Sequence, residues 1–391
     1  MTDIVSPGRV VTDVAFAECH ISPEAQQEAV RAMAGGWLTT GARTVRFEAE
    51  LARWIGARES VAVSSCTAAI ELALRALDLP AGSAVLTPVL TFCGAVHAIV
   101  HAGLRPVLLD VDEATLTVSP AEVERKARTV SARALVVQHM AGYPVPTAEL
   151  AQAAGLPVQR VVEDAAHGLG AEADGHPVGS LGSTACFSFY ATKNLPIGEG
   201  GALTTSDGER ADRLRVLRQH GMSRDAWQRY ETGATWRYGV EEAGLKANFT
   251  DLQAAIGLGQ LSHLTRWQDR RAAIAQRYDE QLREVPGLTL PPRPRTGRHA
   301  WHLYVIRVQP RYGRSRDELS ARLADHGIGT SVHFIPVHRF SYFKRLLGDQ
   351  TSALPVAERV GDQLLSLPLH PHLSDDAVDH VCAQIGSLRR P

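Results

Sequence analysis

Residues 184–203 read TACFSFYATKNLPIGEGGAL, and this stretch decides the fold class and chemistry that we expect. An apolar, aromatic run typical of a strand leads into a polar turn that carries Lys193, with glycines on either side. A lysine amine forms a Schiff base with an aldehyde only when it is deprotonated, and burial among apolar groups lowers its pKa toward that state. Taken alone, a lysine in such a turn is usually an ordinary surface residue.

The segment 158–171, VQRVVEDAAHGLGA, supplies the second feature. It reads as an apolar strand that ends in Glu163 and Asp164, with His167 just beyond. In open α/β sheets, ligands bind at the carboxyl ends of the strands. An Asp there can pair with the protonated ring nitrogen of pyridoxal phosphate while a lysine holds the aldehyde. Alone, Asp164 would more often cap a helix, but together with Lys193 it favours a cofactor site.

Seven motifs in order extend this interpretation to nearly the whole chain, from about residue 28 to about 385. They are GGWLTTG (35–41), VAVSSCTAAIELAL (61–74), LTPVLTFCGAVHAI (86–99), VVEDAAHGLGA (161–171), FSFYATKNLPIGEGG (187–201), NFTDLQAAIGLGQL (248–261) and GIGTSVHFIPVH (327–338). With them the chain resembles the DegT/DnrJ/EryC1/StrS family of pyridoxal-phosphate sugar aminotransferases. Family members that act as dehydratases or regulators lack the lysine, whereas Lys193 is present here.

The composition and charge of the chain exclude several classes of binding partner and site. The 391 residues are 45% hydrophobic and 21% charged, as in an ordinary globular protein with room for two domains. With a formal net charge of −1, the protein has no overall positive field that would attract nucleic acid or an anionic membrane. Five scattered cysteines without a CxxC pair indicate reduced thiols rather than disulfides or a zinc site. Because the sequence shows neither a signal segment nor an apolar run of about 18 residues, we expect a cytoplasmic protein.

The order of apolar runs predicts an α/β fold. Strands expected at 106–111, 134–139 and 158–163 alternate with helices at 120–128 and 147–154, which indicates a mostly parallel sheet covered on both faces. The resemblance implies the aspartate-aminotransferase-like fold (PLP fold type I), with a large cofactor-binding domain and a smaller α+β C-terminal domain. We place these domains at 1–255 and 256–391, connected by one long helix over 251–282. Further helices are expected near 352–365 and 374–388.

The resemblance also implies the residues of the cofactor site. Thr67 and Ala68 would cradle the phosphate at the start of a helix, Phe92 would stack on the pyridine ring, and His167 would orient Asp164 or the phenolate side. The alternatives are a capped helix at 64–68 and a core position for Phe92. The full implied set is catalytic Lys193, Asp164 and His167, with cofactor binding by Thr67, Ala68, Phe92, Asp164, His167, Ser188, Lys193 and Asn248.

Asn248 carries the prediction of a shared site. In the family the irregular stretch 221–251 is where a neighbouring subunit reaches over the site, and Asn248 matches the residue that crosses to the partner's phosphate. The resemblance therefore implies a homodimer with shared active sites. The alternative is that Asn248 caps a helix of its own subunit.

Substrate contacts are implied at Trp37, Thr39, Tyr190, His333 and His338. For Trp37 the alternative is a core position, and for the two histidines an exposed loop. We expect no metal at His97 and His101, because the HExxH glutamate and a third ligand are missing.

The resemblance implies a reaction that moves an amino group from an amino-acid donor, glutamate, to a nucleotide-linked keto-deoxysugar. The sequence GEGG at 198–201 favours amination at C4, since many C3 enzymes of the family carry GDGG instead. The alternatives are a C3 aminotransferase, a dehydratase or lyase on the same fold, and a regulatory binding protein.

Overall fold

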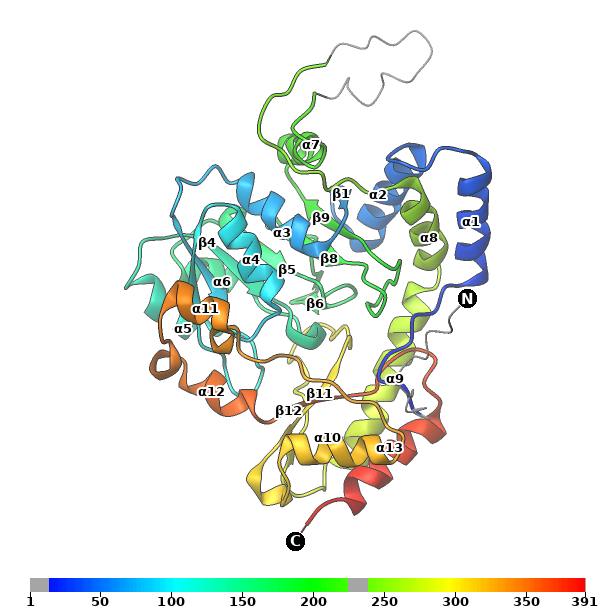
Figure 1. The fold of residues 1–391 in the computed structure, drawn as a ribbon, viewed down its shortest axis with the longest axis vertical. Coiled ribbons are helices and arrows are strands. Elements are labelled where there is room, and N and C mark those ends of the chain that lie inside the picture. Colours follow the sequence, from blue (N-terminus) through cyan, green and yellow to red (C-terminus); the bar gives the residue numbers. More distant parts are fainter. Residues whose placement is uncertain (1–13, 224–237, 391) are drawn as a thin grey trace, which may run out of the picture.

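A seven-stranded sheet forms the centre of the computed structural model, which describes residues 14–223 and 238–390 (Figure 1). The strand order is β1-β9-β8-β5-β4-β2-β3, and β9 alone among these strands runs antiparallel to its neighbours. The strands are β1 (Glu59–Val63), β2 (Ala84–Pro88), β3 (Arg105–Leu109), β4 (Ala132–Gln138), β5 (Val161–Asp164), β8 (Thr184–Ser188) and β9 (Gly201–Thr205). The predicted α/β class with a mostly parallel sheet is confirmed.

Helices cover both faces of this sheet, so its strands are apolar on both sides. Val61 and Val63 of β1 pack on one face, while Ala62 between them packs on the other. The first face is covered by α3 (Cys66–Arg75), α4 (Cys93–His101) and α7 (Gly208–Leu217). The second face is covered by α2 (Ala42–Ile55), α5 (Pro120–Ala127), α6 (Thr147–Ala153) and α8 (Asp251–Leu261). α1 (Pro23–Ala34) packs against α8 and is capped by Ser22.

The C-terminal part has a core of its own beside a small antiparallel sheet. That sheet consists of β10 (Leu288–Thr289), β11 (Tyr304–Val308) and β12 (Leu364–Leu367), packed with α9 (Leu264–Leu282), α10 (Arg316–Asp325) and α13 (Asp375–Ser387). α11 (Ser341–Leu347) and α12 (Pro355–Gly361) pack toward the large sheet, and β6 (Glu172–Ala173) and β7 (His176–Pro177) form a hairpin. The boundary at 255/256 stays a prediction; Val14 pairs with Ile328 and ties the N-terminal segment to this part.

The predicted single helix over 251–282 is wrong, because α8 ends at Leu261 and α9 begins at Leu264. α8 lies so close to α1 that a Cβ on Gly259 would be 2.4 Å from Ala25 Cα, whereas α9 packs on α13. The two helices therefore pack against different partners, and the helical run is interrupted between them. No glycine or proline marks the break in the sequence.

The predicted helix near 352–365 is only partly right. Its middle is the helix α12, while its last two residues already belong to the strand β12, which pairs antiparallel with β11. The helix α11 was not predicted, while the helix near 374–388 is confirmed as α13. The middle of the predicted irregular stretch, residues 224–237, lies outside the described residues. Across the described residues, no helix is long and apolar enough to cross a membrane.

Strand register brings the polar strand ends together. Gln138 at the end of β4 lies opposite Asp164 at the end of β5, and Asp164 lies opposite Cys186 of β8. Since these three strands are parallel, the chain leaves them at one edge of the sheet. Lys193 follows β8 by five residues, at this edge.

Candidate active site

A cavity of about 490 Å³ lies at this edge of the sheet. Its lining comes from segments far apart in the sequence, including the start of α3, the ends of β4, β5 and β8, and residues 302–303 and 333–334. It brings together eight of the predicted site residues: Thr67, Phe92, Asp164, His167, Ser188, Tyr190, Lys193 and His333.

Lys193 is held in the loop after β8, where its backbone N–H donates to the Tyr190 carbonyl at 2.9 Å. Burial lowers the pKa of Lys193 to about 8, although the nearby Asp164 and Cys66 oppose that shift. Roughly a tenth of this amine is therefore neutral at pH 7, far more than for an ordinary lysine. The structure thus gives Lys193 the environment that nucleophilic attack on an aldehyde requires.

Asp164 is buried at the end of β5, and this burial raises the pKa of its carboxyl group. Its Oδ1 accepts from the Ala166 N–H at 3.1 Å and from the Cys66 thiol at 3.9 Å. Among the described residues, no donor bonds to its Oδ2. The chain continues in a turn rather than a helix, so the helix-cap alternative is wrong. A cationic group in the cavity would stabilise this carboxylate.

His167 is buried and neutral, because burial and the charge of Lys193 hold its pKa well below the ordinary value. The backbone N–H of Ala141 donates to its Nδ1 at 3.2 Å. Since a neutral imidazole carries one proton, that proton lies on Nε2. His167 therefore offers a hydrogen-bond donor to a ligand in the cavity.

The start of α3 borders the cavity on another side. Ser65 caps this helix by accepting from the Ala68 N–H at 3.1 Å, and Ala68 itself does not line the cavity. Thr67 and Ser188, which both carry hydroxyls, do line it. β9 approaches so closely that a Cβ on Gly201 would lie 2.5 Å from the carbonyl carbon of Ser65. Both the predicted cap and an anion-binding helix start are compatible with this arrangement.

Phe92 is 58% exposed and lines the cavity, so a core position for it is wrong. His333 also lines it, with Nδ1 at 2.8 Å from the Ser366 hydroxyl. Burial, with a contribution from Lys193, lowers the pKa of His333 to about 4. A flat aromatic ring and a neutral imidazole therefore both face the space a ligand would occupy.

The other five predicted residues do not line the cavity; they are Ala68, His338, Trp37, Thr39 and Asn248. His338 is buried, and its Nε2 pairs with Glu358 at 2.5 Å, so an exposed loop position is wrong for it. Trp37 is 41% exposed, which rules out the core alternative. The backbone oxygen of Thr39 accepts from the Asp251 N–H, at the start of α8.

Asn248 lies beside this turn, and its amide donates to the Thr40 hydroxyl at 3.0 Å. Thr250 caps α8, with Gln253 completing the capping box. The alternative that Asn248 is a helix cap is therefore wrong. Its predicted contact with a partner's phosphate stays a prediction.

Two polar residues stand out among the cavity residues that were not predicted from the sequence. His302 places Nε2 at 3.5 Å from Lys193 Nζ, and Gln138 has a buried Oε1 without a hydrogen-bond donor in the described chain. The rule for strand ends that selected Asp164 would also have selected Gln138. His302 lies in HAWHLY (299–304), just before β11, where the rule for strand ends does not apply.

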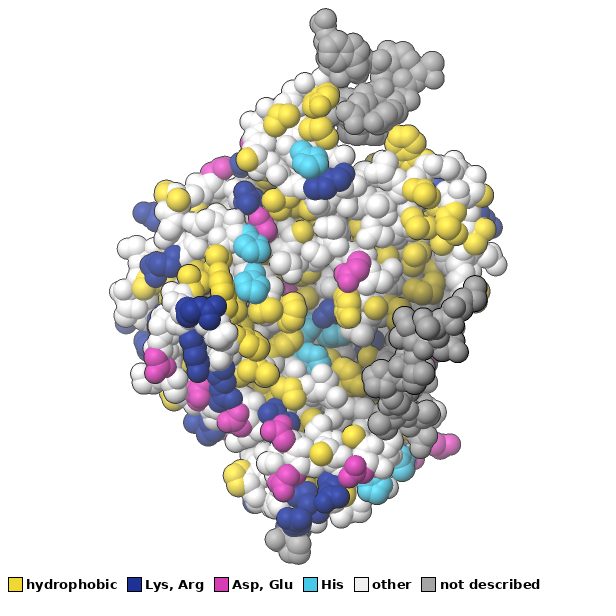
Figure 2. Space-filling model, viewed as in Figure 1, with side chains coloured by type: hydrophobic (Ala, Val, Ile, Leu, Met, Phe, Trp, Pro, Cys, Tyr) yellow, Lys and Arg dark blue, Asp and Glu magenta, His cyan; other side chains and the backbone are white. Residues whose placement is uncertain are grey.

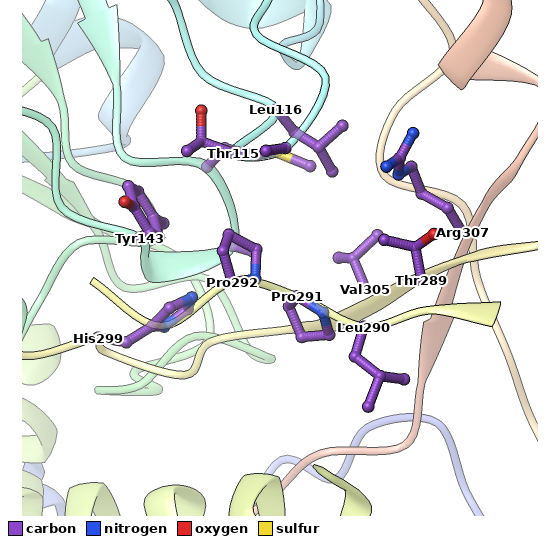
Figure 3. Close-up of a pocket in the computed structure, with 13 residues that line it drawn as sticks. Thr115, Leu116, Tyr143, Thr289, Leu290, Pro291, Pro292, His299, Val305 and Arg307 are labelled. Atoms are coloured by element: carbon purple, nitrogen blue, oxygen red, sulfur yellow. The ribbon is translucent and has the colours of Figure 1, made fainter. Parts of the chain in front are cut away.

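Residues 290–303 connect β10 to β11 and carry His302. This connector packs against the large part of the molecule. Figure 3 shows Pro291 and Pro292 between Tyr143 on one side and Val305 on the other, with His299 near them. This crevice has a volume of only about 20 Å³, so it is nearly filled by its lining. Tyr143 and His299 meet edge to face at 6.0 Å. The path of the connector is therefore defined before it reaches the active-site cavity.

These groups fit pyridoxal phosphate. Asp164 Oδ2, which accepts no hydrogen bond from the described residues, suits a protonated ring nitrogen. The exposed ring of Phe92 suits stacking on a pyridine. Hydroxyls at the start of α3 and at the end of β8 suit a phosphate. Within the described part of the chain, no group of three or more His, Cys, Asp or Glu side chains is placed to hold a metal ion.

Comparison with known proteins agrees with the family resemblance of the sequence motifs. The model of the DegT/DnrJ/EryC1/StrS aminotransferase family matches residues 20–386. The spore coat polysaccharide biosynthesis protein SpsC of Bacillus subtilis is 44% identical over 370 residues, which cover 94% of this chain and 95% of SpsC.

Solved structures with the same fold cover nearly the whole chain. The sugar aminotransferase CalS13 from Micromonospora echinospora superposes with a TM-score of 0.85 at 31% identity, covering 96% of this chain and 100% of CalS13. Spr1654 from Streptococcus pneumoniae, known in a PLP form and a PMP form, gives a TM-score of 0.87 for the PMP form at 29% identity, covering 96% and 98%. The chain therefore belongs to the DegT/DnrJ/EryC1/StrS aminotransferase family and is a pyridoxal-phosphate-dependent sugar aminotransferase.

Proposed function

We propose that this enzyme transfers an amino group from glutamate to a nucleotide-linked keto-deoxysugar, at C4 of the sugar. The observation that carries the proposal is the meeting of Lys193, Asp164 and His167 around one cavity. The position of amination rests on Glu199 in the GEGG sequence. Glu199 is exposed and lines the cavity, so the difference between Glu and Asp at this position can affect the substrate.

Lys193 has two roles in this proposal. Its neutral amine holds the aldehyde of the cofactor, and after release Nζ removes the proton from the α-carbon of glutamate. In the second half-reaction Nζ would deliver a proton to the sugar carbon that receives the amino group. Pyridoxal phosphate, when bound, supplies the electron sink that stabilises negative charge at the reacting carbon.

Asp164 and His167 support that chemistry from two sides. The carboxylate of Asp164 keeps a ring nitrogen protonated, since two opposite charges in a buried site stabilise each other. The Nε2–H of His167 donates to an oxygen of the ligand. Neither residue needs to change its protonation state during turnover.

Product analysis tests the substrate and the position. The enzyme, loaded with pyridoxal phosphate, is incubated with glutamate and a panel of nucleotide-linked 3-keto and 4-keto sugars, and the products are identified by NMR. A 4-amino sugar is the expected product. A 3-amino product shows that the GEGG sequence was misread, and a product that has lost a hydroxyl without gaining nitrogen indicates dehydration.

We further propose a homodimer in which each cavity is completed by the partner subunit. Large hydrophobic side chains are exposed near the cavity and on the turn before α2, namely Trp37, Leu38, Phe92 and Tyr190. Figure 2 shows hydrophobic side chains gathered on the face that carries α3 and α4. Exposed apolar surface of this kind is typical of a protein interface.

Mixed dimers test the shared site. When a Lys193→Ala chain is co-expressed with an Asn248→Asp chain, one site of the heterodimer carries both substitutions and the other carries neither. Activity should then exceed that of either variant homodimer, because the carboxylate at 248 repels only the phosphate of the partner's site. If the mixture shows only the mean activity of its parents, Asn248 acts within its own chain.

A further inference from the structure

His302 lies where it can act directly on the amine of Lys193. Its Nε2 is 3.5 Å from Lys193 Nζ, and its ring packs against that of His167 with the centroids 4.4 Å apart. Its backbone N–H donates to the Ala141 carbonyl at 3.0 Å, while its own carbonyl accepts from Arg271. The position of the ring is thus defined from several directions.

Asn194, next to the lysine, determines which nitrogen of His302 carries the proton. Its Nδ2 donates to two backbone carbonyls, of Leu169 at 3.3 Å and of Ala300 at 3.0 Å. The reverse orientation of the amide would set Oδ1 against two acceptors, so Oδ1 must face His302 Nδ1, at 3.2 Å. An oxygen there requires a proton on Nδ1, and a neutral ring then has a lone pair on Nε2.

The ring is neutral at working pH. Burial, together with the positive charge of Lys193, holds the pKa of His302 well below its ordinary value. Lys193 is therefore the donor in this contact, and His302 the acceptor. Any proton that reaches Lys193 Nζ stays on the lysine.

We propose that His302 is a positioning residue for Lys193, accepting a hydrogen bond from Nζ at Nε2 so that the amine is oriented toward the cavity and its protonated form is stabilised. This rests on the proposed role of Lys193. In that role the lysine must hold a proton between its two transfers, and an acceptor beside Nζ stabilises that state. Asn194 acts one step further away, through the tautomer of His302.

Several other groups act on the same amine and must stay unchanged in the test. The carboxylate and the thiol among them raise the pKa of Lys193, and the two other imidazoles are neutral. These groups are Asp164 at the end of β5, Cys66 at the start of α3, His167 after β5, and His333 in the segment before α11.

The test measures the pKa of Lys193 in cofactor-free protein by competitive acetylation with acetic anhydride, read by mass spectrometry. Lys344, an exposed lysine of α11, is the internal reference. His302→Phe keeps a ring beside His167 but has no lone pair, whereas His302→Gln keeps an acceptor. The Phe variant should lower the pKa of Lys193 by about one unit, because a long hydrogen bond to a charged group is lost. The Gln variant should stay close to the wild type.

An equal pKa of Lys193 in all three proteins, or an equal fall in both variants, overturns the proposal. The tautomer gives an independent check on the wild-type protein. In ¹⁵N-histidine NMR, with the His302 signals assigned by their loss in the Gln variant, Nδ1 should be protonated and Nε2 bare, and the opposite tautomer refutes the inference. Borohydride reduction of the loaded wild-type enzyme, with peptide mapping, separates a failure of Lys193 itself from a failure of His302.

Discussion

The lowered pKa of Lys193 predicts how fast pyridoxal phosphate attaches to the cofactor-free enzyme as pH changes. Only the neutral amine attacks an aldehyde. With a pKa of about 8, Lys193 is roughly 9% neutral at pH 7, whereas an ordinary lysine with a pKa of about 10.4 is only ~0.04% neutral. Attachment at pH 7 should therefore be about 200-fold faster than for an ordinary lysine of equal intrinsic reactivity.

The assay follows the absorbance of the attached cofactor after rapid mixing, between pH 6 and 10. The rate should rise with pH and level off above about pH 8, because the depressed pKa moves the appearance of the neutral amine to lower pH. Lys193→Ala serves as the control for attachment at other lysines. A rate that keeps rising tenfold per pH unit up to pH 10 would refute the claim that burial lowers this pKa.

Three further substitutions have defined outcomes. Asp164→Asn should lower the rate of the glutamate half-reaction by ~10²–10³-fold, as for other preorganised charges, and a near-normal rate would reduce Asp164 to a structural residue. Glu48→Ala leaves the buried guanidinium of Arg218 without its carboxylate and should lower the free energy of unfolding by ~3–5 kcal/mol in urea titrations, with much of the loss recovered when Arg218→Met is added. Ala141 has φ +58° and holds both His167 and His302, so Ala141→Val should lower the melting temperature through ~1–3 kcal/mol of strain, while Ala141→Gly should stay near the wild type.

The predicted residues that line the cavity share one property, which is that a local pattern places them. Asp164 ends an apolar strand, Lys193 follows another, and Thr67 lies in the first turn of a helix after a third. In a parallel sheet the carboxyl ends of neighbouring strands lie at one edge, so three separate local patterns converge on one place. This is why the fold class and the centre of the site could be read from the sequence.

The break between α8 and α9 and the strand β12 had no such local signal. The residues around 262 suit a helix, and the break arises because the two helices pack on different neighbours. The run Leu364–Leu367 suits a helix or a strand, and its pairing with β11 decides between them. Elements whose identity depends on a distant partner could not be predicted from their own residues.

The sequence by itself therefore determined the α/β class, the lysine and aspartate at the strand ends, and the family. Only the tertiary structure decided that His302 meets Lys193 across 109 positions of the chain, and that His338 pairs with Glu358 instead of lining the cavity. Both histidines stand in similar polar and apolar surroundings in the sequence. What separates them is which buried group each one meets, and that depends on how the C-terminal part packs against the large sheet rather than on any local preference of the chain.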